Sequence, residues 1–163
     1  MTTANSTPTD NAQQNSKYFR KALNDLTPNN IGQLKEVNKV LLGDELGQAV
    51  YDDALKVGDF AKLALFNDII VGGIITAKST VAEAKKNKVE IVSLAVLPAY
   101  QKLGLGTMLL DHIINTSETQ LAGSEIHVRI PTKDTAAVSF FTKRGFAASG
   151  DPKSDTQMFV RTI

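Results

Sequence analysis

The feature that most constrains this chain is a segment in which an apolar strand pattern passes through a glycine turn into a helix. Residues 89–96 are mostly apolar and stop just before Pro98, and residues 106–120 have helical periodicity. Between them, residues 101–106 read Gln-Lys-Leu-Gly-Leu-Gly. The first N–H groups of a helix have no intrahelical partner and carry partial positive charge, and glycine lets an anion approach them closely. The segment therefore predicts a phosphate-binding turn.

Composition narrows the class of protein. The formal net charge is +1, and no apolar run approaches the roughly 18 residues of a membrane span, so we expect neither nucleic acid nor a membrane as a partner and expect a cytoplasmic protein. The chain has no cysteine and only two histidines, His112 and His127. A thiolate nucleophile and a zinc signature are therefore excluded, and no metal site is predicted.

The N-terminal residues differ in composition from the rest. Residues 1–17 are mostly Thr, Asn, Ser and Gln, with no large apolar residue after Met1. Such a segment cannot bury enough surface to offset the entropy lost on ordering it, so we interpret it as a disordered polar tail. Residues 18–163 are then expected to form a single domain.

The remaining patterns predict an alternation of strands and helices. Thr27-Pro28 is expected to open a helix that ends at Gly43, Asn67-Asp68 to form a two-residue hairpin turn, and residues 78–88 to be a charged, loop-like connector. The expected elements are strand 19–26, helix 28–42, helix 49–57, strands 60–66, 69–77 and 89–96, helix 106–120, strand 125–130, helix 134–143 and a terminal hairpin over 146–161. This order, βααβββαβαββ, predicts an α/β fold with a mixed sheet and helices on both faces.

The turn lacks the third glycine of a dinucleotide fingerprint and the Gly-Lys-Ser/Thr of a P-loop. Its frame, Gln-x-x-Gly-x-Gly after Val-Leu-Pro-x-Tyr, instead resembles the acetyl-coenzyme A signature of the GNAT N-acetyltransferase superfamily. Within it, residues 26–31, 61–69, 71–73 and 143–146 are similar to the NatE-type protein Nα-acetyltransferases. The resemblance covers about residues 23–161 and implies the GNAT fold, acetyl-coenzyme A as donor and protein N-termini as acceptors. It also implies NatA-type auxiliary and catalytic subunits as partners and, through them, the ribosome.

The same resemblance assigns residues to the cofactor. It places the pyrophosphate on the turn and the pantetheine arm beside the end of the motif strand. Asp134 lies near the position of an asparagine that contacts coenzyme A in the family, and Phe141 stands where the subfamily has a tyrosine. The expected cofactor residues are Leu94, Ala95, Val96, Gln101, Lys102, Leu103, Gly104, Leu105, Gly106, Asp134 and Phe141.

For the chemistry, His127 matches the family's catalytic histidine. Glu90 replaces the subfamily's catalytic tyrosine, and it lies eleven residues before Gln101, where histone acetyltransferases of the superfamily have their general-base glutamate. The acceptor peptide is expected to contact Leu42, Gly43 and Asp44, which align with a Phe-Pro-Val segment, and Met158 and Phe159, which align with a Tyr-Tyr pair.

Other interpretations of these residues remain open. Glu90 could be a solvated residue of an edge strand, and His127 could be a structural histidine. Because the polar residues of the acceptor site are replaced, a non-catalytic subunit that docks on a NatA-type complex is the main alternative to an enzyme. A small-molecule amine acetyltransferase is a third possibility, since the fold alone does not fix the acceptor.

Overall fold

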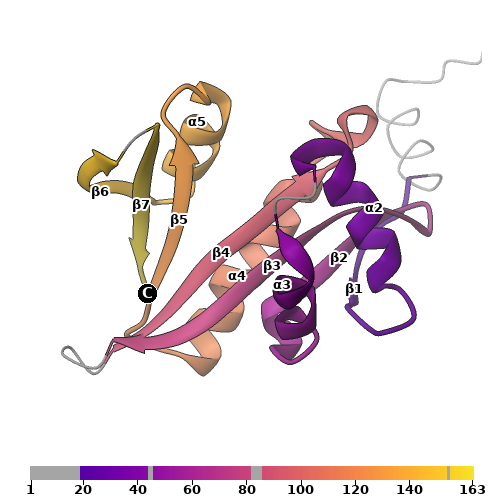
Figure 1. Ribbon diagram of the computed structural model, residues 1–163, viewed down its shortest axis with the longest axis horizontal. Coiled ribbons are helices and arrows are strands. Elements are labelled where there is room, and N and C mark those ends of the chain that lie inside the picture. Colours follow the sequence, from indigo (N-terminus) through magenta and orange to yellow (C-terminus); the bar gives the residue numbers. More distant parts are fainter. Residues whose placement is uncertain (1–18, 44–45, 82–85, 154) are drawn as a thin grey trace, which may run out of the picture.

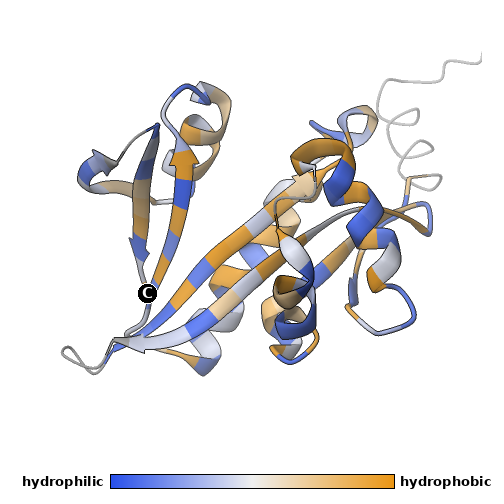
Figure 2. Ribbon diagram, viewed as in Figure 1, coloured by the Kyte–Doolittle hydropathy of each residue, from blue (hydrophilic) through white to orange (hydrophobic). Residues whose placement is uncertain are grey.

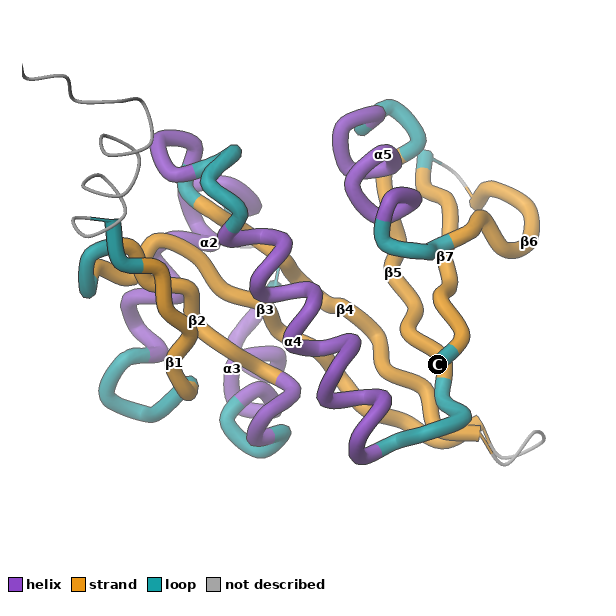
Figure 3. Tube along the Cα trace, turned by 180° about the vertical axis from the view of Figure 1, so that it is seen from behind, coloured by secondary structure: helices purple, strands orange, loops and turns teal. Residues whose placement is uncertain are grey.

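The computed structural model describes residues 19–43, 46–81, 86–153 and 155–163. Their centre is a seven-stranded mixed sheet in the order β1-β2-β3-β4-β5-β7-β6. Helices α2 and α3 cover one face of this sheet, and α4 and α5 cover the other (Figures 1 and 3). The mixed α/β architecture and the order of its strands and helices agree with the sequence pattern. The proposed tail, residues 1–17, lies outside the described residues.

The elements have the following bounds: β1 Lys21–Asp25, α2 Ile31–Leu42, α3 Gly47–Ala54, the short 3₁₀ turn η1 Gly58–Phe60, β2 Ala61–Phe66, β3 Ile69–Val81, β4 Lys86–Val96, η2 Pro98–Tyr100, α4 Leu105–Gln120, β5 Glu125–Pro131, α5 Thr135–Lys143, β6 Ala147–Lys153 and β7 Thr156–Thr162. Helix α2 starts later than predicted because residues 28–30 form a turn, in which the side chain of Asn30 accepts a hydrogen bond from the N–H of Thr27 (2.7 Å). Asn67 and Asp68 both have positive φ, as the predicted two-residue hairpin requires.

The prediction of a charged loop over residues 78–88 is wrong. Strand β3 continues to Val81 and β4 begins at Lys86, and the two strands pair antiparallel from Gly72 with Val96 to Val81 with Lys86. The side chains of Lys78, Ser79 and Thr80 are all exposed. This arm therefore has no buried face, so its hydropathy does not alternate and the strand pattern is hidden in the sequence.

An irregularity in β4 sets the direction of its side chains. Ile75 pairs with Ser93 and Thr76 pairs with Ile91, so Val92 is an extra residue on β4. Such a bulge changes which face the following residues point to. Val89 and Ile91 before it, and Leu94 and Val96 after it, all contact the core on the α4 side. Figure 2 shows the alternation of apolar and polar residues along β4 and β5.

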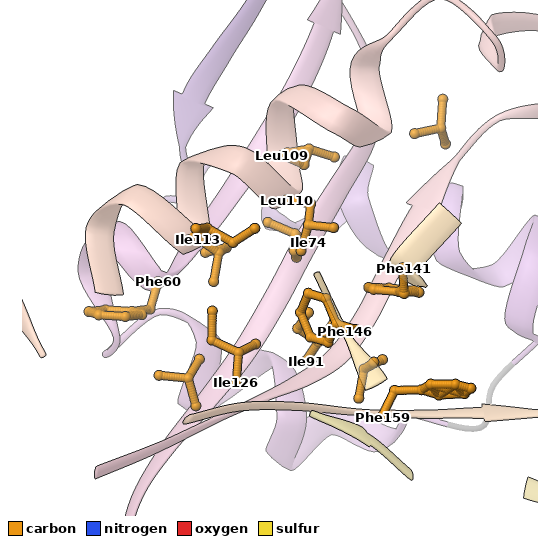
Figure 4. Packing of buried hydrophobic residues seen from close by; sticks show 14 of the residues in the cluster. Phe60, Ile74, Ile91, Leu109, Leu110, Ile113, Ile126, Phe141, Phe146 and Phe159 are labelled. Atoms are coloured by element: carbon orange, nitrogen blue, oxygen red, sulfur yellow. The ribbon is translucent and has the colours of Figure 1, made fainter. Parts of the chain in front are cut away.

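The larger core lies between the sheet and helices α4 and α5. Helix α4 contributes Leu109, Leu110 and Ile113, which have no exposed surface. At the other end of the same cluster, Phe141 of α5 meets Phe146 edge to face, with ring centroids 5.3 Å apart (Figure 4). A second cluster, under α2 and α3, includes Leu34, Tyr51 and Leu63. Together the two clusters fix the helices against the sheet.

Candidate active site

The candidate site lies where two central strands separate. Strands β4 and β5 pair in parallel only from Lys88 with Glu125 to Ile91 with Val128. Beyond this last pair they diverge, as Figure 1 shows, and a cavity of about 490 Å³ opens next to the end of β4. Leu94 and Val96 of β4 line one side, and α5 with its N-cap lines the other. Among the described residues, no strand pairs with the β4 edge that faces the gap, so its N–H and C=O groups can bond to an extended amide-bearing ligand.

The glycine turn forms one end of this cavity. The Gln101 side chain folds back and donates to the carbonyl oxygen of Val96 (Nε2···O 2.9 Å), which fixes the start of the turn. Gly104 has a φ of 86°, a left-handed conformation that favours glycine, and α4 begins at the next residue. No side chain caps α4 and its first turn contains no acidic residue. Within the described part of the chain, the first amides of α4 therefore have no capping side chain.

Two cations lie next to this helix end. The Nζ of Lys21 donates to the carbonyl oxygen of Leu103 (2.8 Å), and Lys102 is exposed in the turn itself. A Cβ built on Gly106 would lie 3.7 Å from the ring of Phe140, so α4 and α5 are already in van der Waals distance here. The turn, the helix dipole and the two ammonium groups form an arrangement that fits a diphosphate.

Most of the residues that the sequence assigned to the cofactor line this one cavity. They are Leu94, Val96, Gln101, Lys102, Gly104, Leu105, Gly106, Asp134 and Phe141. Ala95 does not, because it points to the opposite face of β4, and Leu103 instead lines a hollow of about 150 Å³ with Phe19 and Phe66. Sequence reasoning missed the wall formed by Tyr100, Thr107, Ala136, Ala137 and Phe140. Thr107 follows Gly106 and Phe140 precedes Phe141, so position next to an identified residue was the signal that could have found them.

Asp134 caps a helix in addition to lining the cavity. It is the N-cap of α5, and its Oδ1 accepts a hydrogen bond from the N–H of Ala137 (3.0 Å). This bond satisfies one of the donors that a helix start leaves free. The side chain therefore helps to fix the start of α5, a helix that lines the cavity.

Glu90 and His127 lie at the vertex where β4 and β5 separate. They are direct partners in the parallel ladder, and both point away from α4, because their neighbours on the two strands are buried beneath that helix. Among the described residues, the Glu90 carboxylate has no hydrogen bond or ion pair. His127 is only 18% exposed, and its Nε2 lies 2.9 Å from Oε2 of Glu125, which is also on β5. Sequence reasoning missed Glu125, although its spacing of two residues from His127 on a strand indicates a shared face.

The segments expected to contact the acceptor come from both ends of the sheet. Leu42 and Gly43 lie at the end of α2, and Asp44 falls outside the described residues. On β7, Met158 is the ladder partner of Arg129 and so shares a face with His127. Phe159 points the other way and is 6% exposed in the main core. Of the two β7 residues, only Met158 is therefore on the side of Glu90 and His127.

Two further observations limit the chemistry of the described residues. They contain no group of three or more His, Cys, Asp or Glu side chains placed to hold a metal ion. None of their helices combines the length and the apolar character needed to cross a bilayer.

Comparison with known proteins shows what this arrangement is similar to. The sequence profile of the Acetyltransferase (GNAT) family matches residues 31–146. N-alpha-acetyltransferase 50 of Danio rerio is 36% identical over 127 residues, which are 78% of this chain and 74% of that protein. The probable N-acetyltransferase san of Drosophila melanogaster is 34% identical over 124 residues, 76% of this chain and 66% of that protein.

Among solved structures, Arabidopsis thaliana Naa50 in complex with the bisubstrate analogue CoA-Ac-MVNAL superimposes with a TM-score of 0.79. The sequences are 28% identical in this alignment, which covers 88% of this chain and 99% of that one. These similarities confirm both the family resemblance and the fold that the sequence predicted.

Proposed function

This chain belongs to the acetyltransferase (GNAT) family, and we propose that it is an acetyl-coenzyme A-dependent Nα-acetyltransferase of the NatE type. The observation that supports this most is the position of Glu90 and His127. They are ladder partners at the point where β4 and β5 separate, on the sheet face opposite α4. The cavity that fits a diphosphate lies between β4, α4 and α5, farther along the same gap. The similarity to N-alpha-acetyltransferase 50 over most of the chain supports the α-amino group as the acceptor.

In this proposal the residues of the cavity hold acetyl-coenzyme A, which supplies an activated acetyl thioester. The amides at the start of α4, together with Lys21 and Lys102, hold the diphosphate. The free edge of β4 beside Leu94 and Val96 bonds to the amides of the pantetheine arm, and α5 covers the opposite side. These contacts direct the reactive end toward Glu90 and His127.

The proton of the acceptor is the main chemical problem. A protein α-amino group has a pKa of about 7.7 to 8.0, so only about a fifth to a third of it is neutral near pH 7.4. Glu90 takes the proton from the α-ammonium, directly or through water, and passes it to His127. The neutral amine then forms the N–C bond as the C–S bond breaks, and its second proton ends on the departing sulfur. A positioned base of this kind contributes about 10²- to 10⁴-fold in rate.

The main alternative is a weakly active or inactive subunit. Phe141, at the position of a subfamily tyrosine, has no hydroxyl and is 6% exposed in the core, so it offers no polar group to the site. Under either alternative we propose a cytoplasmic protein that associates with NatA-type auxiliary and catalytic subunits and, through them, with the ribosome. Retained association with the auxiliary subunit, without transfer to any peptide, would favour the inactive subunit.

The enzyme proposal is tested by separating turnover from cofactor binding. Glu90→Gln and His127→Ala should each lower the rate of acetyl transfer to an N-terminal peptide at least tenfold, while calorimetry gives an unchanged Kd for acetyl-coenzyme A. The matched controls Glu118→Gln and His112→Ala, both on α4, should keep turnover close to that of the wild type. Full turnover in both vertex variants would refute the assigned chemistry.

A further inference from the structure

We propose that Glu125 positions His127, holding its imidazole as the Nε2–H tautomer so that Nδ1 is the ring nitrogen that accepts a proton. The catalytic consequence rests on the proposed function, whereas the pairing itself does not. Glu125 is a positioning residue in this account, because it acts on the acceptor only through His127.

The geometry of β5 places the two side chains together. Glu125 and His127 are two residues apart on a strand, so both point away from the core formed by Ile126 and Val128. The distance between Nε2 of His127 and Oε2 of Glu125 is 2.9 Å, which is that of a good hydrogen bond. Both groups are partly shielded, since the side chains are 18% and 32% exposed. Water therefore competes less for this bond than on an open surface.

The carboxylate is held from its other side as well. Oε1 of Glu125 lies 3.8 Å from Nζ of Lys86 on β4, across the parallel ladder. Among the described residues of β4 and β5, the other charged groups on this face are Lys88, the ladder partner of Glu125, Glu90, the ladder partner of His127, and Arg129, two residues farther along β5. Glu90 and Glu125 therefore lie on different strands next to His127, and of the two only Glu125 is hydrogen-bonded to the imidazole.

The bond determines which nitrogen can act. A carboxylate is only an acceptor, so the nitrogen that faces it has to carry a hydrogen. In a neutral imidazole the other nitrogen then has the lone pair, and this nitrogen is Nδ1. Among the described residues Nδ1 has no hydrogen-bond partner, so it is available to take the proton that leaves the α-ammonium. The Glu125 carboxylate balances the positive charge of the imidazolium until that proton passes to water.

The tautomer is measured directly by NMR on protein with ¹⁵N-labelled histidine. The chain has only two histidines, and His112 is an internal reference because its Nε2 lies 2.8 Å from the carbonyl oxygen of Asp59, which also requires an Nε2–H. At a pH where the rings are neutral, both should show the Nε2–H pattern of nitrogen shifts. In Glu125→Ala the signal of His127 should move toward the average of the two tautomers, and that of His112 should stay. An unchanged His127 signal would overturn the pairing.

The catalytic consequence is measured by kinetics on the same proteins. Glu125→Ala should lower kcat about tenfold to a hundredfold, part of the total contribution of the base, with KM for acetyl-coenzyme A unchanged. Glu125→Asp should restore part of this loss, and Glu118→Gln, which changes a carboxylate on α4, should have no effect. Equal kcat for Glu125→Ala and wild type would overturn the positioning role. Absence of transfer by the wild type, with the His127 signal still dependent on Glu125, would overturn the proposed function and leave the pairing established.

Discussion

Replacement of Gly72 by alanine tests whether the position of β4 determines both stability and cofactor binding. Gly72 lies on β3 opposite Val96, and a Cβ built on it would be 2.5 Å from the carbonyl oxygen of Ala95 and 3.1 Å from Cα of Val96. Ordinary contacts of this kind are about 3.5 Å or longer, so β4 has to move away by several tenths of an ångström or more. The atoms that must move belong to the backbone and cannot rotate aside.

Forced overpacking of this kind costs about 1 to 3 kcal/mol. For a domain of this size each kcal/mol lowers Tm by about 2 to 4 °C, so Gly72→Ala should melt at least about 2 °C and up to about 12 °C below the wild type. The displaced segment includes Leu94 and Val96, which line the cavity. We therefore expect weaker binding of acetyl-coenzyme A, by about tenfold if 1.4 kcal/mol of contact energy is lost.

Calorimetry and thermal unfolding measure both effects, and Gly32→Ala on α2 is the matched control. A Cβ on Gly32 meets nothing within 4 Å, and alanine is favoured over glycine in a helix by about 0.5 to 1 kcal/mol. The control should be as stable as the wild type or more so, with the same affinity. If Gly72→Ala kept both the Tm and the affinity of the wild type, the close contact between β3 and β4 would determine neither stability nor cofactor binding.

Two further predictions concern the turn and an ion-pair cluster. Gly104→Asp should abolish binding of acetyl-coenzyme A, because a carboxylate would stand at the diphosphate position. The uncharged variant Gly104→Asn should weaken binding much less, and equal calorimetric affinities for the two variants would contradict an electrostatic site. The hydrogen bond from Lys62 and its positive charge lower the pKa of Asp25. Burial of Lys62 acts to lower its own pKa, but its hydrogen bonds to Asp25 and Asp59, the latter at 3.3 Å, and the charges of these carboxylates outweigh burial and raise that pKa. Because the pKa of Asp25 is lowered in the folded state, its ion pair stabilises the protein above about pH 4, and this stabilisation is lost as the pH falls through the folded-state pKa. In urea titrations, the difference in free energy of unfolding between wild type and Asp25→Asn should therefore shrink as the pH falls below about 4. A difference that stayed constant with pH would refute the assignment.

Local signals were sufficient to predict most elements. The helix α4 follows from a glycine turn and a periodic apolar face, and its start at Leu105 is one residue from the expected position. The turn at Asn67 and Asp68 follows from the preference of these residues for positive φ. Each of these features depends on residues that are close in the sequence.

The features that the sequence did not reveal depend on how strands pair, which the hydropathy pattern does not record. The exposed arm of β3 and β4 is held by backbone hydrogen bonds and has no hydrophobic face to mark it. The bulge at Val92 changes which side chains of β4 face the cavity, and no local pattern indicates it. Met158 and Phe159 point to opposite faces of the sheet because side-chain direction alternates along a strand. Which of them shares the face of His127 is set by the register of β7 against β5.

The residues of the candidate site differ in how far the sequence alone could identify them. The cofactor residues from Gln101 to Gly106 form one continuous turn, so a motif could identify them. The link between Glu125 and His127 requires knowing that β5 is a strand with that face exposed beside β4. Its chemical meaning appears only when the ladder places Glu90 opposite His127.

The most direct test of the central claim is to locate the acetyl group after the reaction. The protein is incubated with acetyl-coenzyme A and a panel of peptides that each have a free α-amino group and an internal lysine, and mass spectrometry identifies the modified nitrogen. We expect acetyl on the α-nitrogen of at least one peptide, at a rate that depends on His127, and none on a peptide whose α-amino group is blocked. Transfer confined to lysine or to small amines, or no transfer to any peptide, would contradict an Nα-acetyltransferase.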